Sequence, residues 1–340
     1  MAPGRVAVLG SANADLAIRV ARLPAPGETL LAGGLQTIPG GKGANQAAAA
    51  ARLGAPTEFL GRVGDDGNGG MLLAALREAG AGTAAAVEAA GEPSGTAAVF
   101  LLPGGENSIV VCGGANMSGA WEVTPAMRAE LAAASVLLLQ REVPEGVNAE
   151  AAKAAKADTA GPGGSSTVIL DAGGADGPLS AELLAAVDVL SPNETELARI
   201  TGLPTDSDDQ AVAASKALLD RPGSGVAAVI TKLGARGSIF VGDPALGAGQ
   251  DAGRRTAWFQ PAFPVAEVVD TTGAGDCFTA AVGARLAAGV TVAEAMRFAS
   301  AAGALCVQTL GAMPSMPSLE ATERLAGESS EQGVARPLQA

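Results

Sequence analysis

The sequence contains no histidine and no tyrosine, and aromatic residues make up only 3% of its 340 residues. Without histidine, the chain cannot form a Ser-His-Asp or Cys-His site or a histidine-ligated metal centre. Any acid–base catalysis therefore depends on Asp, Glu, Lys or Cys. Because hydrophobic residues still make up 48% of the chain, we expect a large core of aliphatic and alanine side chains.

Cysteine is also scarce. Its three positions, Cys112, Cys277 and Cys306, are far apart and odd in number, which indicates neither a disulfide framework nor a metal site. We expect a reducing compartment and therefore a cytoplasmic protein. No run of 18 apolar residues is present, so no membrane-spanning helix is expected. The strand pattern begins at Arg5 and leaves no room for a signal peptide.

Positive charge is limited, with 22 Lys and Arg against 35 Asp and Glu, for a net charge of −13. This balance argues against nucleic acid or an anionic membrane as a partner. An acidic protein can still bind phosphate groups locally, through helix N-termini, a few lysines and a divalent cation.

From residue 120 onward, predicted helices and strands alternate regularly. The expected strands in this half are 135–139, 167–171, 187–191 and 226–231. Such alternation predicts a parallel sheet covered by helices on both faces. A loop rich in Gly, Pro and Ser is expected at 158–166, and the polar end of the chain is expected to be frayed.

Two earlier segments have a strand pattern without helices. Residues 13–37 alternate apolar and polar positions between turn residues, and the strands 96–102 and 108–112 form an expected hairpin. Together they predict a small separate sheet with one apolar face. The expected members of that face are Leu16, Ile18, Val20, Val99, Leu101, Ile109 and Val111. An exposed apolar sheet of this size usually meets a partner.

The stretch 268–276 combines several signals. An expected strand ends at Val268 and Val269, a Gly273-Ala274-Gly275 turn follows, and a small-residue helix is expected at 277–288. Glycines at a helix start let an anion approach unpaired backbone N–H groups. Asp276 is unusual in such a turn. Helix capping is one explanation, and proton abstraction beside a bound phosphate is the other.

Residues suited to ligand contacts end or follow several of the expected strands. They are the polar residues Asn13, Asp15, Glu142, Asp171, Asn193, Lys232, Asp270 and Asp276, together with Gly234. Because ligands of open parallel sheets bind at the carboxyl ends of the strands, these positions predict one shared site.

The common nucleotide motifs are absent. A Walker A motif would need Gly and Ser or Thr where the chain has Gln36 and Gly43. The two nearest G-x-G-x-x-G candidates end at Gln46 and Phe278 instead of glycine. P-loop NTPases and dinucleotide enzymes are therefore disfavoured.

Two motifs carry a resemblance to a known family. Gly40-Gly41-Lys42-Gly43-Ala44-Asn45-Gln46 and Asp270-Thr271-Thr272-Gly273-Ala274-Gly275-Asp276 are similar to the two signatures of the PfkB carbohydrate kinases. Within this family the chain most resembles the ribokinase branch, over about residues 5–320. Further matching motifs are Gly10–Asp15, Pro26–Thr29, Gly64–Asp66, Gly113–Asn116, Pro192–Glu196 and Gly311–Ser315.

Two positions depart from the bacterial pattern of this branch. Leu170-Asp171-Ala172-Gly173-Gly174 stands in place of an Asn-Pro motif and resembles plant-type members. Lys232 stands where many bacterial members have Thr. A plastid stroma location, after removal of a transit peptide, is therefore an alternative to the cytoplasm.

The resemblance implies an α/β fold, with a ribokinase-like three-layer α/β/α sandwich around a mostly parallel sheet and a small β-sheet lid. The implied core covers 1–13, 39–94 and 113–325, and the implied lid covers 14–38 and 95–112. A flexible tail is expected at 326–340. The resemblance also implies a homodimer through the lid sheets.

The implied activity is ATP-dependent phosphorylation of D-ribose at O5. Asp276 would be the general base, and Gly273, Ala274 and Gly275 would form the anion hole. Alternatives are another sugar or nucleoside kinase of the same fold, of the fructokinase or adenosine kinase type, or a non-catalytic relative that serves as a binding module. The intact Asp276 and glycine turn argue against that last alternative.

The resemblance also implies two binding sets. Ribose would contact Asn13, Asp15, Gly41, Lys42, Asn45 and Glu142, together with Asp276. The nucleotide would contact Asn193, Lys232, Gly234, Gly275 and Ser300. From the residues alone, Asn13 and Asp15 could be turn formers, 40–43 a tight turn, and Glu142 a solvated charge.

Two metal ions are implied as well. Mg²⁺ and its waters would lie near Asn193 and Glu196, with Glu196 acting indirectly, although the same pair also fits a capping arrangement. K⁺ would be held by two loops, as a monovalent activator. Its implied ligands are Asp270, Thr272, Cys306, Thr309, Gly311 and Ser315, several of them through backbone carbonyls. Cys277 and Cys306 are expected to be packed thiols.

Overall fold

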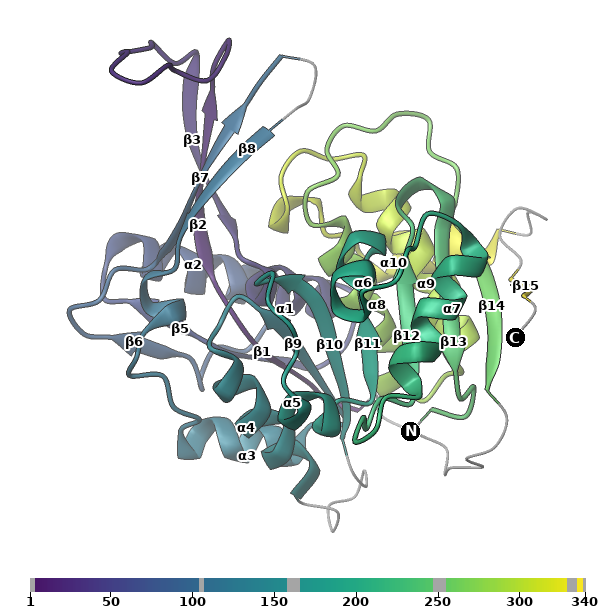
Figure 1. The fold of residues 1–340 in the computed structure, drawn as a ribbon. Coiled ribbons are helices and arrows are strands. Elements are labelled where there is room, and N and C mark those ends of the chain that lie inside the picture. Colours follow the sequence, from purple (N-terminus) through teal and green to yellow (C-terminus); the bar gives the residue numbers. More distant parts are fainter. Residues whose placement is uncertain (1–3, 104–106, 158–165, 247–254, 329–334, 339–340) are drawn as a thin grey trace.

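A nine-stranded mixed sheet forms the centre of the molecule (Figure 1). This computed structural model describes residues 4–103, 107–157, 166–246, 255–328 and 335–338. The parallel strands are β1 (Val6–Leu9), β4 (Thr57–Leu60), β9 (Val136–Arg141), β10 (Thr167–Gly174), β11 (Val189–Ser191) and β12 (Ala228–Lys232). The antiparallel strands β13 (Gly237–Gly242), β14 (Thr256–Pro261) and β15 (Arg336–Pro337) follow at one edge. The predicted mostly parallel sheet is confirmed.

Helices cover both faces of this sheet (Figure 1). One layer contains α3 (Pro125–Ala133), α4 (Glu145–Ala157), α5 (Ala181–Ala186), α6 (Glu194–Thr201) and α7 (Asp208–Leu219). The other contains α1 (Lys42–Arg52), α2 (Gly67–Glu78), α8 (Ala274–Ala287), α9 (Val292–Cys306) and α10 (Leu319–Gly327). Alternate residues of each strand enter one of two separate hydrophobic clusters, as Leu137 and Leu138 of β9 do. The three-layer sandwich is therefore confirmed.

The core is aliphatic and alanine-rich, as the composition predicts. Ala47, Ala48, Ala49 and Ala50 of α1 are all fully buried. Small side chains let helices pack closely on the sheet, and a Cβ at Gly283 of α8 would come within 2.7 Å of Leu138. Close packing of α1 and α8 brings the starts of these two helices together.

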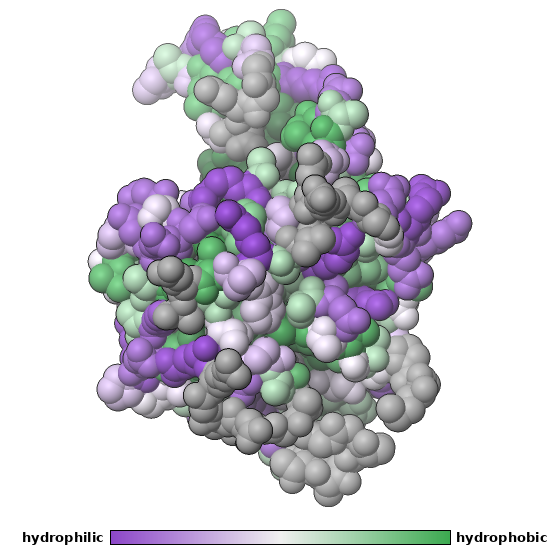
Figure 2. Space-filling view, turned by 90° about the vertical axis from the view of Figure 1, so that its right-hand side faces the viewer, coloured by the Kyte–Doolittle hydropathy of each residue, from purple (hydrophilic) through white to green (hydrophobic). Residues whose placement is uncertain are grey.

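A second, four-stranded sheet projects from the core (Figure 1). Its order is β3 (Gly34–Gly40), β2 (Asn13–Arg19), β7 (Gly95–Leu101) and β8 (Asn107–Cys112). We call this sheet the lid. The predicted small separate sheet is confirmed, whereas the division of the chain into core, lid and tail domains stays a prediction. Figure 2 shows the lid standing above the body of the molecule.

The expectation of a single apolar lid face is wrong. Ala17 of β2 lies opposite Val99 of β7, and Val99 lies opposite Ile109 of β8. Because neighbours alternate in direction along a strand, Leu16 and Ile18 point to the other face. The sequence pattern of each strand is right, but it contains no information on the register between strands.

Several element boundaries also differ from the predictions. The alanine-rich stretch 46–53, which ends before Gly54, predicts a helix, but the helix begins at Lys42. The helix expected at 277–288 begins at Ala274. Residues 57–63 predict one strand, which divides into β4 and β5 (Arg62–Gly64). Strand β5 pairs in a separate two-stranded sheet with β6 (Val87–Ala89), which the sequence pattern did not indicate.

The expected strand before the glycine turn is absent. Val268 and Val269 are 56% and 50% exposed, and the backbone N–H of Val269 donates to the carbonyl of Val307 at 2.8 Å. The turn is therefore entered from a loop tied to the end of α9. Helix α10 was also missed, and most of the loop predicted at 158–166 and of the tail at 326–340 lies outside the described residues. In the part of the chain that is described, every helix is too short or too polar to span a bilayer.

Candidate active site

The predicted site residues converge where helices α1 and α8 begin, at the carboxyl ends of the parallel strands. Both helices start after a glycine with positive φ, 88° at Gly41 and 80° at Gly273, so neither N-cap residue supplies a side-chain hydrogen bond to its helix. Asp276 lies in the first turn of α8 but does not cap it. The capping explanation for Asp276 is therefore wrong. The N–H of Ala274 donates to the Thr271 carbonyl at 3.2 Å, whereas the next N–H groups of α8, at Gly275 and Asp276, have no partner among the described residues and are available to an anion.

Gly273 and Gly41 also allow close backbone contacts. A Cβ at Gly273 would lie 2.9 Å from the Cα of Ala312, and a Cβ at Gly41 would lie 2.6 Å from the backbone nitrogen of Asn13. Neither contact leaves room for a side chain. These glycines thus hold α8 against the 310–312 loop and α1 against the lid strand β2.

The Asp276 carboxylate is surrounded by donors from α1. It is 4% exposed, and it accepts hydrogen bonds from Asn45 Nδ2 at 2.9 Å and from Gln46 Nε2 at 3.3 Å. Lys42 Nζ lies 3.6 Å from its Oδ1. The structure therefore brings Lys42 and Asn45 together with Asp276, as the motifs predict, although Asp276 is more than 200 positions away from both in the chain.

Burial controls the electrostatics of this carboxylate. Desolvation raises the pKa of Asp276, and this outweighs the opposite influence of the Lys42 ammonium. The Coulomb attraction of Asp276 in turn raises the pKa of Lys42. A carboxylate with a raised pKa is a stronger base than an ordinary aspartate, which suits proton abstraction.

Gln46 belongs to a relay that sequence reasoning missed. Its Oε1 accepts from Gln140 Nε2 at 2.7 Å, which turns the Nε2 end of the Gln46 amide toward Asp276. Asn148 Nδ2 donates to the backbone carbonyl of Gln140 at 2.7 Å and so holds β9 to α4. Gln46 stands inside the first motif, but nothing in the sequence indicates its partners in β9 and α4.

Asn13 and Asp15 extend from the first residues of β2. Asn116, 1% exposed, donates to Asn13 Oδ1 at 2.8 Å and also pairs with both backbone groups of Ala12. Asn13 is thereby fixed with its Nδ2 donors free for a ligand. Asn116 was seen only as part of a matching motif, and its position beside Asn13 could not be read from the sequence.

The Asp15 carboxylate packs over Gly40, where any Cβ would collide with it. Burial, together with the smaller effect of the nearby Glu142 and Asp276 carboxylates, raises the pKa of Asp15 to about 7. The three carboxylates therefore interact electrostatically. Glu142 itself accepts from Ser11 Oγ at 2.6 Å and from the backbone N–H of Lys42 at 3.0 Å, so it ties the start of α1 to the end of β1.

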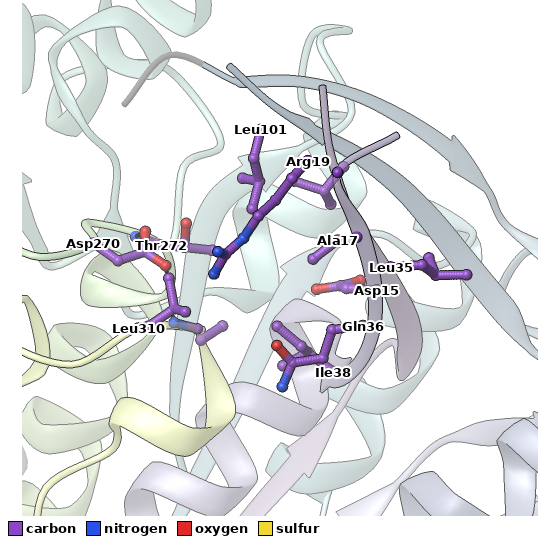
Figure 3. Close-up of a pocket in the computed structure, with 15 residues that line it drawn as sticks. Asp15, Ala17, Arg19, Leu35, Gln36, Ile38, Leu101, Asp270, Thr272 and Leu310 are labelled. Atoms are coloured by element: carbon purple, nitrogen blue, oxygen red, sulfur yellow. Dashed lines mark hydrogen bonds between the residues drawn. The ribbon is translucent and has the colours of Figure 1, made fainter. Parts of the chain in front are cut away.

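A cavity of about 230 Å³ lies between the inner face of the lid and the core. Asp15, Ala17 and Arg19 line it from β2, and the 270–272 and 310–312 loops line it from the core. Figure 3 shows Arg19 and Leu101 extending from the lid toward Asp270, Thr272 and Leu310. The cavity is smaller than the about 300–1,000 Å³ that is usual for drug-sized ligands, and its lining combines Asp15, Arg19 and Asp270 with mostly apolar side chains.

The residues predicted for the nucleotide lie at the end of β12, at the starts of α6 and α8, and within α9. Asn193 and Glu196 form a capping box at the start of α6, with reciprocal hydrogen bonds of 2.8 Å. Ser300 in α9 is 6% exposed, and its Oγ has no hydrogen-bond partner among the described residues. Gly234 begins a short turn with a φ of 57° after β12. No contact within the described residues joins Ser300 or Gly234 to Asp276.

Lys232 forms an ion pair with Asp171, a residue that the sequence places at this edge of the sheet without indicating a role for it. Its Nζ lies 2.6 Å from Asp171 Oδ2, and Asp171 is 1% exposed. Thr279 Oγ1 donates to the same oxygen at 2.8 Å. Burial opposes ionisation of Asp171, but Lys232 and Lys42 lower its pKa below the ordinary value.

Asp270 joins the two loops predicted to hold a monovalent cation. It accepts from the backbone N–H groups of Thr272 and Gly311, both at 2.9 Å. Ser315 Oγ donates to the Ala312 carbonyl at 2.7 Å and lies 3.0 Å from Cys306 Sγ. The backbone N–H of Thr309, another predicted ligand, donates to the Cys306 carbonyl at 3.2 Å.

No group of three or more Asp, Glu or Cys side chains suited to a metal ion occurs among the described residues. A cation at these loops would therefore depend on backbone carbonyls, hydroxyls and water. The Cys277 and Cys306 thiols are both buried and form no disulfide, as expected of packed thiols.

Comparison with known proteins agrees with this geometry. The family model for pfkB family carbohydrate kinases matches residues 4–319. The chain is 44% identical to a ribokinase of Arabidopsis thaliana over 322 residues, covering 94% of this chain and 80% of the relative. It is 35% identical to a ribokinase of Bacillus subtilis, covering 94% and 98%.

A solved structure is also similar throughout. The structure of Arabidopsis thaliana ribokinase complexed with ribose and ATP superposes with a TM-score of 0.85 and 42% identity, covering 97% of this chain and 100% of the other.

Proposed function

The chain belongs to the pfkB family of carbohydrate kinases, and from this premise we propose that it transfers the γ-phosphoryl group of ATP to O5 of D-ribose. The products would be ribose 5-phosphate and ADP. The likeness to ribokinases, one of them in complex with ribose and ATP, supports this substrate pair. The proposal rests on one observation. The Asp276 carboxylate is buried in the first turn of α8 and does not cap that helix.

Asp276 would act as the general base. Its carboxylate takes the proton from the O5 hydroxyl as O5 attacks the γ-phosphorus. The bond between the γ-phosphorus and the bridging oxygen breaks, and ADP leaves with the electron pair. Asn45 and Gln46 hold the carboxylate in place, so that it meets the hydroxyl without reorganisation.

The first turn of α8 would form the anion hole. The backbone N–H groups of Gly273, Ala274 and Gly275 lie at the positive end of a helix that has no side-chain cap. Fixed donors of this kind stabilise charge that develops on the transferred phosphoryl group.

Six residues would bind ribose beside Asp276: Asn13, Asp15, Gly41, Lys42, Asn45 and Glu142. Two polar groups among them lack protein partners and suit hydroxyl groups. Asn45 Oδ1 is buried without a hydrogen-bond partner in the described chain. Asn116 occupies the oxygen of Asn13, and Asn13 Nδ2 has no hydrogen-bond partner in the same part of the chain. Asp15 accepts hydrogen bonds from two neighbouring hydroxyls, which selects against deoxy sugars.

The nucleotide would lie across Asn193, Lys232, Gly234, Gly275 and Ser300. The unpartnered Ser300 Oγ is a hydrogen-bonding group available to the adenine end. Lys232 supplies positive charge near the phosphates, where an acidic protein needs it.

Mg²⁺ would accompany ATP near Asn193 and Glu196. The capping box uses only one oxygen of Glu196, so the other remains available to a water of the hydrated ion. Magnesium keeps several waters and needs few protein ligands. When bound, it would neutralise phosphate charge and orient the γ-phosphoryl group.

K⁺ would lie between the 270–272 and 306–315 loops. Asp270 already bridges these loops through Thr272 and Gly311, and Ser315 packs behind them. The proposed ligands are Asp270, Thr272, Cys306, Thr309, Gly311 and Ser315, partly through their carbonyls. The ion would stabilise the loop that leads into the anion hole.

The lids of two copies would associate to form a homodimer. Strand β8 is an unpaired edge within the described sheet, and Ile109, Val110 and Val111 on it are 51%, 59% and 55% exposed. Exposed apolar edges normally find a partner. Three free cysteines fit a reducing compartment, either the cytoplasm or the plastid stroma.

A substrate panel with coupled ADP detection tests this proposal. Ribose, 2-deoxyribose, fructose and adenosine are compared by kcat/KM, and ³¹P NMR identifies the phosphorylated oxygen. We expect ribose to be the best substrate and O5 the modified position. Faster turnover of fructose or adenosine would favour another kinase of this family, and ATP binding without turnover of any alcohol would favour a non-catalytic relative.

A further inference from the structure

Four charged side chains alternate in sign at the start of α8. Lys42 Nζ lies 3.6 Å from Asp276 Oδ1, and Lys232 Nζ lies 2.6 Å from Asp171 Oδ2. Lys42 also packs on Gly173, where a Cβ would lie 2.7 Å from its Nζ, which places it beside Asp171 as well. The order is therefore Asp276, Lys42, Asp171, Lys232. Asp171 is the member without a part in the proposed reaction.

Stability alone is a weak explanation for the Asp171–Lys232 pair. Asp171 is 1% exposed and the Lys232 side chain is 13% exposed, so both charges are largely removed from water. Desolvation of two ions commonly cancels their attraction, and apolar side chains of similar volume often stabilise a protein equally well. A buried pair at the edge of a ligand site therefore indicates a functional use.

The pair also directs the Lys232 ammonium. An ammonium has three N–H donors. Asp171 takes one at 2.6 Å and Thr279 Oγ1 lies 3.4 Å away, which leaves at least one donor for a ligand. Thr279 itself is fixed, because it donates to Asp171 and contacts Ser191 Oγ at 3.0 Å.

Gly275 gives this ammonium access to the helix start. A Cβ at Gly275 would lie 3.6 Å from Lys232 Nζ, so the ammonium stands beside the backbone of the first turn of α8. A side chain larger than methyl at position 275 would come between them. Backbone N–H groups and a lysine cation thus face the same space.

We propose that Asp171 is a positioning residue, which holds the Lys232 ammonium beside Gly275 so that it contacts the phosphoryl group during transfer. The inference rests on the proposed function for the transfer from ATP, but not on the identity of the sugar. Lys232 serves as a fixed cation for charge that develops on the phosphoryl oxygens. Asp171 supplies the geometry and touches no substrate.

A double-mutant cycle separates this role from simple charge neutralisation. The variants are Lys232→Met, Asp171→Asn and the double variant, each compared for kcat, for the KM of the sugar and for Tm. We expect Lys232→Met to lower kcat about 10²- to 10³-fold, as is typical for loss of a donor to developing charge. The sugar KM should change by less than about threefold.

Asp171→Asn should lower kcat about tenfold, because the ammonium keeps its charge but loses its anchor. Lys232→Arg should recover part of the activity lost in Lys232→Met, since it restores the charge. The double variant should recover the Tm lost in Lys232→Met, because the unpaired buried carboxylate is gone, yet stay about 10²-fold slow in kcat.

Two outcomes would overturn the proposal. If the double variant regains wild-type kcat, Lys232 only neutralises Asp171. If Asp171→Asn alone leaves kcat unchanged while Lys232→Met is slow, Asp171 does not position the ammonium. Lys156→Met is the control, because Lys156 forms a part-buried ion pair with Asp188 at 2.7 Å, with side chains 28% and 26% exposed, just before β11 at the opposite end of the strands. Its kcat should equal that of the wild type.

Nucleotide titrations keep the test independent of turnover. With Mg²⁺ present and sugar absent, calorimetry compares ADP with the β,γ-imido analogue of ATP. Lys232→Met should raise the Kd for the analogue about tenfold or more and keep the Kd for ADP within about twofold, because only the analogue carries the third phosphoryl group. Equal effects on both nucleotides would contradict the contact. If the wild type phosphorylates a sugar other than ribose, the proposed substrate is wrong but the same cycle applies with that sugar.

Discussion

At the scale of single residues, Asp15 and Asp276 are acidic side chains of the proposed sugar site whose pKa burial raises. Their proposed tasks differ. Asp276 would accept a proton during the reaction, whereas Asp15 would need to be ionised before ribose binds, since it would accept hydrogen bonds from hydroxyls. Glu142 and Asp276 both add to the raised pKa of Asp15.

The affinity for ribose should therefore depend on pH. With a pKa of about 7 in the free protein, Asp15 is mainly protonated below that pH and mainly ionised above it. We expect the Kd for ribose, measured by calorimetry, to rise about tenfold between pH 8 and pH 6. Asp15→Asn should bind weakly at both values and lose most of this dependence. An unchanged pH dependence in Asp15→Asn would contradict the assignment.

The motif spacing predicts much of the site at this scale. Lys42, Asn45 and Asp276 are brought into contact as expected, because the starts of α1 and α8 pack together. The motif spacing does not predict which residues hold the site side chains in place. Gln46 and Asn116 act through partners about 100 positions away, at Gln140 and at Asn13, and only the fold reveals such pairs.

At the scale of elements, the start of α8 depends on Gly273. Its φ of 80° is unfavourable for other residues, and a Cβ would lie 2.9 Å from the Cα and Cβ of Ala312. Any side chain at position 273 would therefore displace the first turn of α8 from the 310–312 loop. The same displacement would move the donors of the proposed anion hole.

Gly273→Ala should accordingly lower kcat about 10²-fold in the coupled assay, since it disturbs fixed donors. Gly289→Ala is the matched control, because Gly289 has a φ of 79° just beyond the other end of α8 and nothing within 4 Å of its Cβ. The control should lose about 1 kcal/mol of stability in urea unfolding and keep its kcat. Equal kcat values in the two variants would contradict the role of the turn.

Helices and buried strands of the core were predictable from periodicity and turn residues. The incorrect predictions concern elements whose structure depends on tertiary contacts. Val268 and Val269 have a strand pattern, but Val307 binds the backbone of Val269 and no strand forms. Helix α1 begins four residues before its expected start, because a backbone N–H of its first turn is bound by Glu142, 100 positions away.

At the scale of the whole molecule, the lid is the part that the sequence describes least completely. Its four strands were expected, but register determines which side chains face the cavity. Asp15, Ala17 and Arg19 face the core together with Val99 and Leu101. The other face and the β8 edge remain for the proposed association of two lids.

Val110→Glu tests this association. Val110 is 59% exposed on β8, so the substitution should leave the folded monomer intact. A charge placed in an apolar interface should shift the dimer to monomer in sedimentation equilibrium at micromolar concentration. Leu203→Glu is the control, since Leu203 is 38% exposed next to α6 on the core. A dimer that persists in Val110→Glu would contradict an interface through β8.

The central claim is that Asp276 removes the proton from O5, and Asp276→Asn tests it most directly. The amide keeps the shape of the side chain and still accepts a hydrogen bond from Asn45, but it cannot take up a proton. We expect kcat for ribose phosphorylation to fall about 10²- to 10⁴-fold, while the ribose Kd stays within about threefold. A variant with near-normal kcat would contradict the claim.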